Sequence, residues 1–283
     1  MGKSIQNLFN SQELDPRKVI EEISLIVKQK PVSDSNVTSS GLFTMFAHPQ
    51  YAPRRVNWDF SNGKKDVTII GKGVLYDSGG YNIKPDASDM FNDRYGALNA
   101  VLLAKVLKLN VVVFFVVNLI HDGAVLPGTI LTSLKGKKVC IDNTDAEGRI
   151  GLAQLIETID TTHIISFATL TGHSVAAIGE GHAEVFSKDK SKLIKLLKTD
   201  LQIIGTGRYF DDYKKKLYKG KVLQNSNPQD KGAGAAKAYA FLNEFLQKNQ
   251  SLTHFDIAGI MNTQEKNHTK SLKELITAVK TIL

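Results

Sequence analysis

The stretch Asn143-Thr144-Asp145-Ala146-Glu147-Gly148-Arg149 decides how this chain folds. It follows an apolar run, Lys138–Ile141, and precedes residues 150–156, whose apolar side chains have helical spacing. A strand is therefore expected to end here and a helix to begin, and Asn143, Thr144 and Asp145 are all residue types that cap helices. A capped turn with surface charges is the ordinary interpretation of such a junction. One capping residue is enough for that purpose, so a seven-residue stretch with two carboxylates and a guanidinium indicates a functional site.

A second polar stretch, residues 70–85, begins where the apolar segment 67–70 ends and is dense in glycine. Glycine at a turn allows positive φ and lets the backbone approach a ligand closely. Asp93 follows in the next helical segment. Six charged side chains would then converge at strand ends, where open α/β sheets place their ligands. They are Lys72, Asp77, Lys84, Asp93, Asp145 and Glu147.

This set of converging charges indicates a metal site. Carboxylates that converge repel one another unless cations neutralise them, and divalent metals accept oxygen ligands of this kind. A carboxylate shared between two metals is typical of a hydrolytic two-metal centre. The residues alone therefore favour a site for divalent cations.

The same residues resemble a known family. Residues 143–149 read NTDAEGR, which resembles the signature of the cytosol leucyl aminopeptidase family, and residues 72–85 (KGVLYDSGGYNIKP) are similar to its other hallmark. Further matches lie at residues 168–172 (ATLTG) and 254–259 (HFDIAG). The resemblance runs from about Gly41 to the C-terminus in the family's order, which makes it far more specific than a single short motif.

The resemblance implies two divalent metal ions, zinc or manganese, while magnesium and cobalt also suit such ligands. The implied ligands are Lys72, Asp77, Asp93, Asp145 and Glu147. Asp77 and Glu147 would bridge the metals, and Lys72 and Asp93 would hold the more loosely bound ion. A lysine ligand must be neutral, and two adjacent cations lower its pKa. Without the resemblance, an ion pair with Asp77 is the preferred interpretation of Lys72.

Two catalytic residues are implied in the same way. Lys84 would polarise the scissile carbonyl and stabilise the oxyanion. Arg149 would hold a bicarbonate that relays the proton of the attacking water, because a planar guanidinium suits a planar anion. The alternative for Arg149 is a salt bridge to a carboxylate at the start of the helix.

The resemblance also implies a peptide-binding cleft. Thr169, Leu170 and Gly172 would hold the amino end of the substrate through backbone groups. Met90, Ala258 and Met261 match positions that shape the pocket for the first side chain, and an apolar pocket with two methionines favours leucine-like residues. Methionine on a helix is more often part of the core, so core packing stays an alternative for Met90 and Met261.

The order of the expected elements favours an α/β fold, a three-layer α/β/α sandwich around a mixed, largely parallel sheet. Strands are expected at residues 66–71, 110–117, 138–141, 163–168 and 253–257, with further strand-like segments at 41–48 and 55–60. Helices are expected at residues 89–107, 148–158, 173–178, 190–201, 211–219, 232–248 and 270–282.

The chain is expected to divide near residue 40. Residues 1–40 hold one amphipathic helix at about 15–28, with Asp15 as its cap and Pro16 at its first position, followed by a polar linker at 31–40. They resemble a remnant of the N-terminal α/β domain that the family normally carries. Residues 41–283 are expected to form the catalytic metallo-aminopeptidase domain.

Composition limits the partners and the compartment. Of the 283 residues, 42% are hydrophobic and 23% are charged, as in ordinary globular proteins. Apolar runs are too short to span a bilayer, the N-terminus has no apolar signal core, and Cys140 is the only cysteine, so a cytoplasmic protein without membrane contact is expected. The net charge of +8 raises nucleic acid as a partner, but the lysines of residues 187–198 and 213–221 interleave with leucines at helical spacing. Solvated helix faces explain that pattern better, so nucleic acid is not expected as the main partner.

Two functions remain open from the sequence. The first is an active aminopeptidase that cleaves peptides, assembled as the hexamer that the family forms. The second is a catalytically impaired or truncated paralogue with a binding or structural role, nucleic-acid binding included. The missing N-terminal domain, the altered loop 118–129 and the altered segment 267–273 motivate the second hypothesis. The first is favoured because every implied ligand and both catalytic positions are present.

Overall fold

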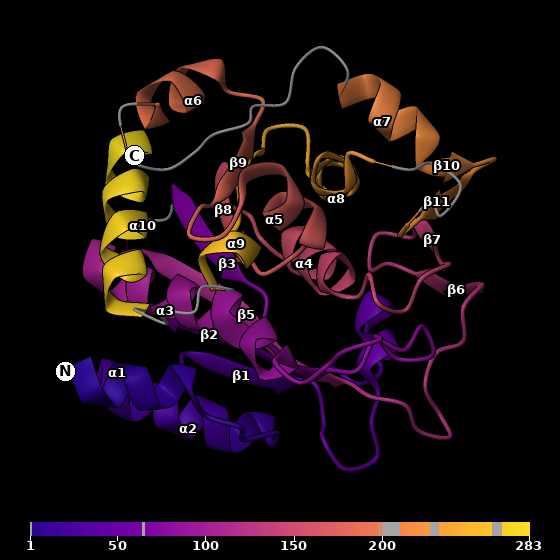
Figure 1. Ribbon diagram of the computed structural model, residues 1–283, viewed down its shortest axis with the longest axis horizontal. Coiled ribbons are helices and arrows are strands. Elements are labelled where there is room, and N and C mark those ends of the chain that lie inside the picture. Colours follow the sequence, from indigo (N-terminus) through magenta and orange to yellow (C-terminus); the bar gives the residue numbers. More distant parts are fainter. Residues whose placement is uncertain (1, 64–65, 198, 200–209, 227–231, 262–267) are drawn as a thin grey trace.

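The computed structural model describes residues 2–63, 66–197, 199, 210–226, 232–261 and 268–283 (Figure 1).

At the centre of the molecule lies a mixed sheet in the order β1-β2-β5-β3-β8-β12-β9, and β4 pairs with β5 beyond the end of β3. The strands are β1 (Ser33–Asn36), β2 (Arg54–Asp59), β3 (Val67–Gly71), β4 (Val74–Asp77), β5 (Asn110–Asn118), β8 (His163–Ala168), β9 (Glu184–Ser187) and β12 (Ser251–Asp256). Strands β5, β3, β8 and β12 are parallel, whereas β2 and β9 run antiparallel to their neighbours β5 and β12. The expected mixed, largely parallel sheet is therefore confirmed.

Strand β5 shows how the sheet separates two cores. Residues 111–118 are all buried, which is typical of a strand covered on both faces. Val113 and Phe115 belong to one apolar cluster, and Val112 and Phe114 belong to the other, because successive side chains point to opposite faces. Each cluster is closed by helices, so the molecule is the three-layer sandwich that the sequence predicts.

Helices cover both faces of the sheet (Figure 1). One face carries α1 (Gly2–Phe9), α2 (Pro16–Val27), α3 (Tyr95–Leu107), α6 (Lys190–Leu196) and α10 (His268–Ile282). The other carries the 3₁₀ helix η1 (Gly41–Phe46), α4 (Gly148–Glu157) and α8 (Gly234–Asn243). The remaining helices are η2 (Met90–Arg94), α5 (Gly172–Ile178), α7 (Phe210–Lys216) and α9 (Ala258–Met261).

A second, smaller sheet lies beside the first. Its order is β10-β11-β7-β6, with bounds β6 (Thr129–Thr132), β7 (Lys138–Ile141), β10 (Tyr218–Lys219) and β11 (Val222–Gln224). Strand β7 leads directly into residues 143–149. The polar stretch that decides the fold therefore comes from the small sheet, while residues 72–85 begin at the end of β3 in the large one.

Several local predictions differ from the structure. Residues 41–48 were expected to be strand-like, but η1 occupies most of them. Its buried side chains are Leu42, Phe43, Met45 and Phe46, which is the spacing of a helix rather than of a strand. Part of the expected linker, Ser33–Asn36, instead pairs with β2 as an edge strand.

The N-terminal helices are part of the main core. Asp15 caps α2 as expected, and its Oδ1 accepts the backbone N–H of Arg17 at 3.0 Å. Buried apolar residues of α1 and α2 belong to the same cluster as β3 and β5. Helix α1 was not predicted, and the domain boundary near residue 40 stays a prediction.

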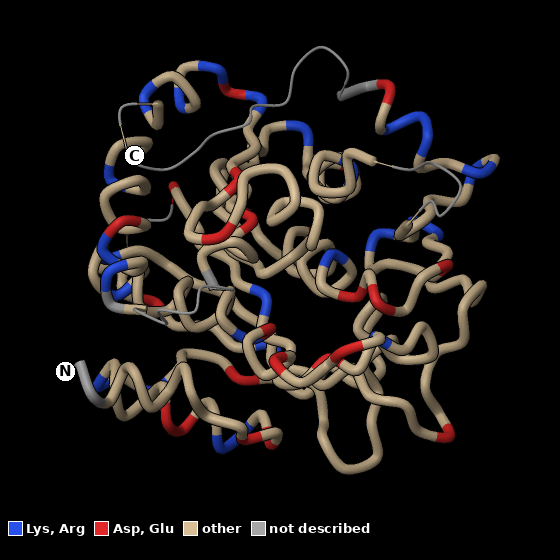
Figure 2. The backbone as a smooth tube through the Cα atoms, in the orientation of Figure 1, with Lys and Arg blue, Asp and Glu red and all other residues tan. Residues whose placement is uncertain are grey.

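Basic residues gather on α6, α7 and β10 at one edge of the molecule (Figure 2). Lys190 and Lys195 of α6 and Lys214 and Lys215 of α7 are exposed, as expected for solvated helix faces. The helix predicted at 190–201 ends at Leu196, and residues 198, 200 and 201 lie outside the described part. Within the described ranges, every helix is too short or too polar to cross a bilayer.

We expect Gly96→Ala to destabilise the fold, because a Cβ at this position would lie 2.5 Å from the carbonyl oxygen of Phe167 and 2.8 Å from that of Lys72. Both atoms belong to the backbone and cannot rotate away, so the free energy of unfolding should fall by about 1–3 kcal/mol. The measurement is urea unfolding followed by the fluorescence of the single tryptophan, Trp58, which is buried.

The control is Val106→Ala in the same helix, where the side chain is 53% exposed and the change should stay within about 0.5 kcal/mol. Equal stability of the two variants would contradict the close contact between α3 and the ends of β3 and β8.

Candidate functional site

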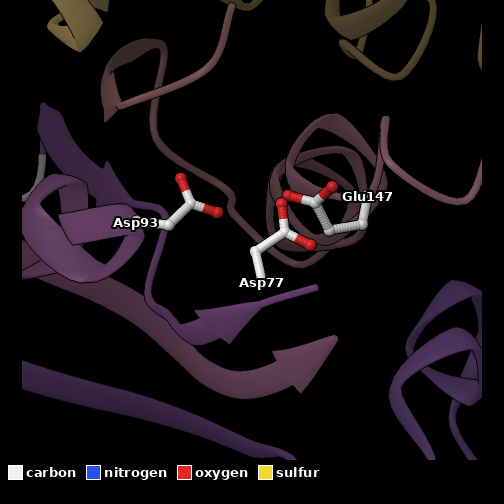
Figure 3. Close-up of side chains that lie close together, drawn as sticks. All are labelled: Asp77, Asp93 and Glu147. Atoms are coloured by element: carbon white, nitrogen blue, oxygen red, sulfur yellow. The ribbon is translucent and has the colours of Figure 1, made fainter. Parts of the chain in front are cut away.

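Three buried carboxylates from different elements meet at the carboxyl end of the parallel strands. Asp77 ends β4, Asp93 lies in η2 and Glu147 precedes the first turn of α4. One oxygen of each lies within 4.8 Å of the others, and no side chain of the three is more than 7% exposed. Figure 3 shows the three carboxylates around a common space.

Lys72 lies among these carboxylates as an ammonium group. Its Nζ is 2.7 Å from Asp93 Oδ1 and 2.9 Å from Glu147 Oε1, and it donates to the carbonyl oxygen of Thr169 at 3.0 Å. Burial alone would lower the pKa of Lys72, but the neighbouring carboxylates outweigh it and the pKa is raised. The sequence offered Asp77 as the ion-pair partner, whereas the structure pairs Lys72 with the other two acids.

Gly148 makes room for Lys72 at the start of α4. A Cβ at residue 148 would lie 2.5 Å from Cε of Lys72 and 2.8 Å from its Nζ. A larger residue at position 148 would displace the Lys72 side chain, which comes from the other polar stretch. This contact could not be seen in either stretch alone.

Lys84 contacts the two acids of the cluster that Lys72 does not, Asp77 and Asp145. Its Nζ lies 3.0 Å from Asp77 Oδ2 and also contacts Asp145 Oδ1. Burial would lower its pKa, but Asp77, Glu147 and Asp145 raise it, so the side chain is an ammonium group. Burial, Glu147 and Asp93 in turn raise the pKa of Asp77.

The cluster fits divalent cations. Four acids share the space with only two lysines, so the site has more acidic than basic groups. Asp93 Oδ2 and Glu147 Oε2 are buried, and each lacks a hydrogen-bond donor among the described residues. Buried charged oxygens without partners cost free energy, and oxygen-binding cations would satisfy them.

The cap-type residues of the NTDAEGR stretch serve other purposes. Helix α4 has Glu147 at its cap position without a side-chain cap bond. Thr144 instead forms hydrogen bonds with the glycine-rich stretch. Its N–H donates to Asn82 Oδ1 at 2.8 Å and its Oγ1 donates to the carbonyl of Gly79 at 2.7 Å. Asn143 Oδ1 accepts the N–H of Asp145 at 2.8 Å. The two bonds of Thr144 join the two polar stretches, whereas the bond between Asn143 and Asp145 lies within one of them.

Arg149 is not among the residues that line the cleft beside the carboxylates. Its Nη1 donates to the carbonyl oxygen of Asn225 at 2.9 Å, and its Nε is buried without a partner among the described residues. Burial lowers its pKa. The alternative of a salt bridge is not realised in the described part of the chain, where no carboxylate lies within 4.0 Å of its guanidinium. The bicarbonate expected at Arg149 stays a prediction.

A cleft of about 450 Å³ opens beside the cluster. Five of the six residues expected to contact substrate line it, namely Met90, Thr169, Leu170, Gly172 and Ala258. The side chain of the sixth, Met261, lies outside the described residues. Lys72, Asp77, Lys84, Asp93 and Asp145 also line the cleft. The structure therefore brings these residues together, and their individual roles stay predictions.

Asp256 holds the loop that forms one wall of the cleft. Its carboxylate accepts the N–H of Leu170 at 3.1 Å, the hydroxyl of Thr171 at 2.7 Å and the N–H of Ala258 at 3.2 Å. Burial raises the pKa of Asp256 to about 6. The side chain thus links the segment after β8 to the segment after β12.

Two asparagines contact the site that the sequence did not single out. Asn118 donates to Asp77, and Asn225 donates from Nδ2 to the carbonyls of Asn143 at 2.7 Å and Ala146 at 3.2 Å. Both lie at strand ends far from the recognisable motifs. Their only sequence signal is a polar residue where a strand ends, Asn118 as the last residue of β5 and Asn225 directly after β11.

A model of the cytosol aminopeptidase family, catalytic domain, matches residues 16–283. The cytosol aminopeptidase of Dictyostelium discoideum is 36% identical over 221 residues, which cover 72% of this chain and 42% of that protein. A probable cytosol aminopeptidase of Xanthobacter autotrophicus is 33% identical over 276 residues, 87% of this chain and 54% of that protein. The chain thus spans about half the length of these curated relatives.

Solved structures show the same fold at lower identity. The leucyl aminopeptidase from Trypanosoma brucei in complex with actinonin has a TM-score of 0.83 at 20% identity, covering 99% of this chain and 62% of that one. The bottromycin maturation enzyme BotP in complex with Mn has a TM-score of 0.81 at 22% identity, covering 97% of this chain and 69% of that one.

His254 makes stability depend on pH. Its Nδ1 lies 2.7 Å from Ser166 Oγ inside the sheet, and burial together with the charge of Arg149 lowers its pKa to about 3. Below pH 6.5 His254 is protonated in the unfolded chain but stays neutral in the folded protein. The free energy of unfolding therefore falls as the pH drops toward 3. At pH 5 this histidine should remove about 2 kcal/mol from the free energy of unfolding.

The measurement is urea unfolding of the metal-free protein and of His254→Gln at pH 7.5 and pH 5.0. The wild type should lose more stability than the variant between the two pH values. Identical losses would show that His254 does not stay neutral in the folded protein.

Proposed function

Because the chain belongs to the cytosol aminopeptidase family, we propose that it is a metal-dependent aminopeptidase that releases N-terminal residues from peptides. The observation that carries the proposal is the buried group of Asp77, Asp93 and Glu147, with unpartnered oxygens beside a cleft. Buried carboxylates without partners cost free energy, so they are expected at a metal centre rather than in a part of the protein that only supports the fold.

The proposed metal ligands are Lys72, Asp77, Asp93, Asp145 and Glu147. When bound, two divalent cations supply Lewis acidity that makes water a nucleophile near neutral pH. The two ions are proposed to be zinc, manganese or one of each, and magnesium or cobalt is compatible with these ligands. Lys72 would have to lose the proton that it holds among Asp93 and Glu147 in order to act as a ligand.

Lys84 is the proposed electrophilic residue. Its ammonium group lines the cleft and is fixed between Asp77 and Asp145. A fixed positive charge at this place would stabilise the oxyanion that develops on the scissile carbonyl. Arg149 is proposed to hold bicarbonate as the proton relay, because its unpartnered Nε leaves a donor for an anion.

The cleft wall supports a preference for leucine-like N-terminal residues. Met90, Leu170, Val175 and Ala258 supply apolar surface. The backbone of the loop that Asp256 holds would bind the amino end of the peptide. A cytoplasmic homohexamer is the assembly proposed from the family resemblance, and the mass of the protein in solution tests it.

We expect purified protein to hydrolyse leucine 4-nitroanilide after addition of Mn²⁺ or Zn²⁺. Lys84→Ala should lower kcat by about 10²–10³-fold at saturating metal, because it removes one stabilising group from the oxyanion. Lys190→Ala, which changes an exposed lysine far along the chain, is the matched control and should leave kcat unchanged.

Loss of activity in Asp145→Ala, Glu147→Ala double variants, together with loss of bound metal, would support the assigned site. Wild-type protein that binds two metals but turns over no peptide would favour the impaired paralogue. Wild-type protein that binds no metal would contradict the enzymatic function altogether.

A further inference from the structure

We propose that Asn118 is a positioning residue that orients the Asp77 carboxylate toward the metal site, an inference that rests on the proposed metal-dependent function. Asn118 is the last residue of β5, and its side chain is buried. It lies where the large sheet, the glycine-rich stretch and the NTDAEGR stretch meet.

Both N–H groups of the Asn118 amide are used. Nδ2 donates to Asp77 Oδ1 at 2.7 Å and to the carbonyl oxygen of Thr144 at 3.1 Å. Its backbone carbonyl accepts the N–H of Ser78 at 3.0 Å and the hydroxyl of Ser78 at 2.9 Å. One residue therefore fixes the residue after Asp77 and the side chain of Asp77 at the same time.

The two oxygens of Asp77 have different surroundings. Oδ1 accepts two neutral donors, Asn118 Nδ2 and the N–H of Gly79 at 2.9 Å. Oδ2 lies 3.0 Å from Lys84 Nζ, on the side of the cleft. With Oδ1 held in this way the carboxylate cannot rotate freely, and Oδ2 stays directed at the cluster. Ligating carboxylates in metal sites are commonly oriented by such outer hydrogen bonds.

The chemistry of residue 118 should matter more than its volume. An aspartate has nearly the same shape as asparagine, but it would place a negative oxygen against Asp77 and would offer no N–H to Thr144. An alanine would remove the donors without adding charge. If residue 118 served packing alone, alanine would lower the affinity for metal more than aspartate would. If it orients Asp77, aspartate lowers that affinity more than alanine does.

Asn99 is the matched control. It is also a fully buried asparagine, and its Nδ2 donates to the carbonyl oxygen of Tyr95 at 2.9 Å within α3. No carboxylate of the cluster is bonded to it among the described residues. Loss of this amide should affect stability without affecting the carboxylate cluster.

The experiment is calorimetric titration of metal-free, folded protein with Mn²⁺, with the wild type compared with Asn118→Ala, Asn118→Asp and Asn99→Ala. We expect Asn118→Ala to weaken Mn²⁺ binding by about 10–100-fold and Asn118→Asp to weaken it further. Asn99→Ala should unfold at lower urea concentration but bind Mn²⁺ as the wild type does. If Asn118→Ala does not fold, Asn118→Ser keeps a hydroxyl donor and should bind more tightly than Asn118→Asp.

The outcomes separate this inference from the proposed function. A wild type that binds no Mn²⁺ contradicts the metal-dependent function. A wild type that binds Mn²⁺ alongside Asn118 variants of equal affinity overturns the role of Asn118 alone. Equal weakening by Asn99→Ala and Asn118→Ala, or tighter binding by Asn118→Asp than by Asn118→Ala, also overturns it.

Discussion

Three buried carboxylates and the partly exposed Asp145 lie together with only two ammonium groups, and much of the surrounding chain is arranged to hold them there. Like charges in a dry site repel strongly, so each acid is fixed by donors from a different direction. Lys72 joins Asp93 to Glu147, and Lys84 joins Asp77 to Asp145. Asp93 Oδ2 and Glu147 Oε2 have no hydrogen-bond donor among the described residues, and divalent cations at this place would satisfy them.

The fold supplies these side chains from independent parts. In the large sheet, Lys72 follows β3 and Asp77 is the last residue of β4, and residues after β7 in the small sheet provide the NTDAEGR acids. Close backbone packing brings the parts together. The start of α3 touches the ends of β3 and β8 at Gly96, and Thr144 clasps the glycine-rich turn. The site therefore depends on the docking of two sheets as much as on either motif.

Much of this was predictable from the sequence, and the exceptions have a common cause. The mixed, largely parallel sheet and the meeting of the charged residues at strand ends follow from local patterns, and the structure contains both. The partners of Lys72, the second sheet around β7 and the contacts of Asn118 and Asn225 depend on segments far apart in the chain. The error at Gly41–Phe46 arose because a short apolar run fits a strand or a helix until its packing is known.

The most direct test of a metal centre is anomalous X-ray diffraction from crystals grown with Mn²⁺. A two-metal centre would give two anomalous peaks within about 2–2.6 Å of oxygens of Asp77, Asp93 and Glu147, with Lys72 no longer in ion-pair contact with both acids. Crystals that diffract well, show no peak at these carboxylates and keep Lys72 between Asp93 and Glu147 would contradict it.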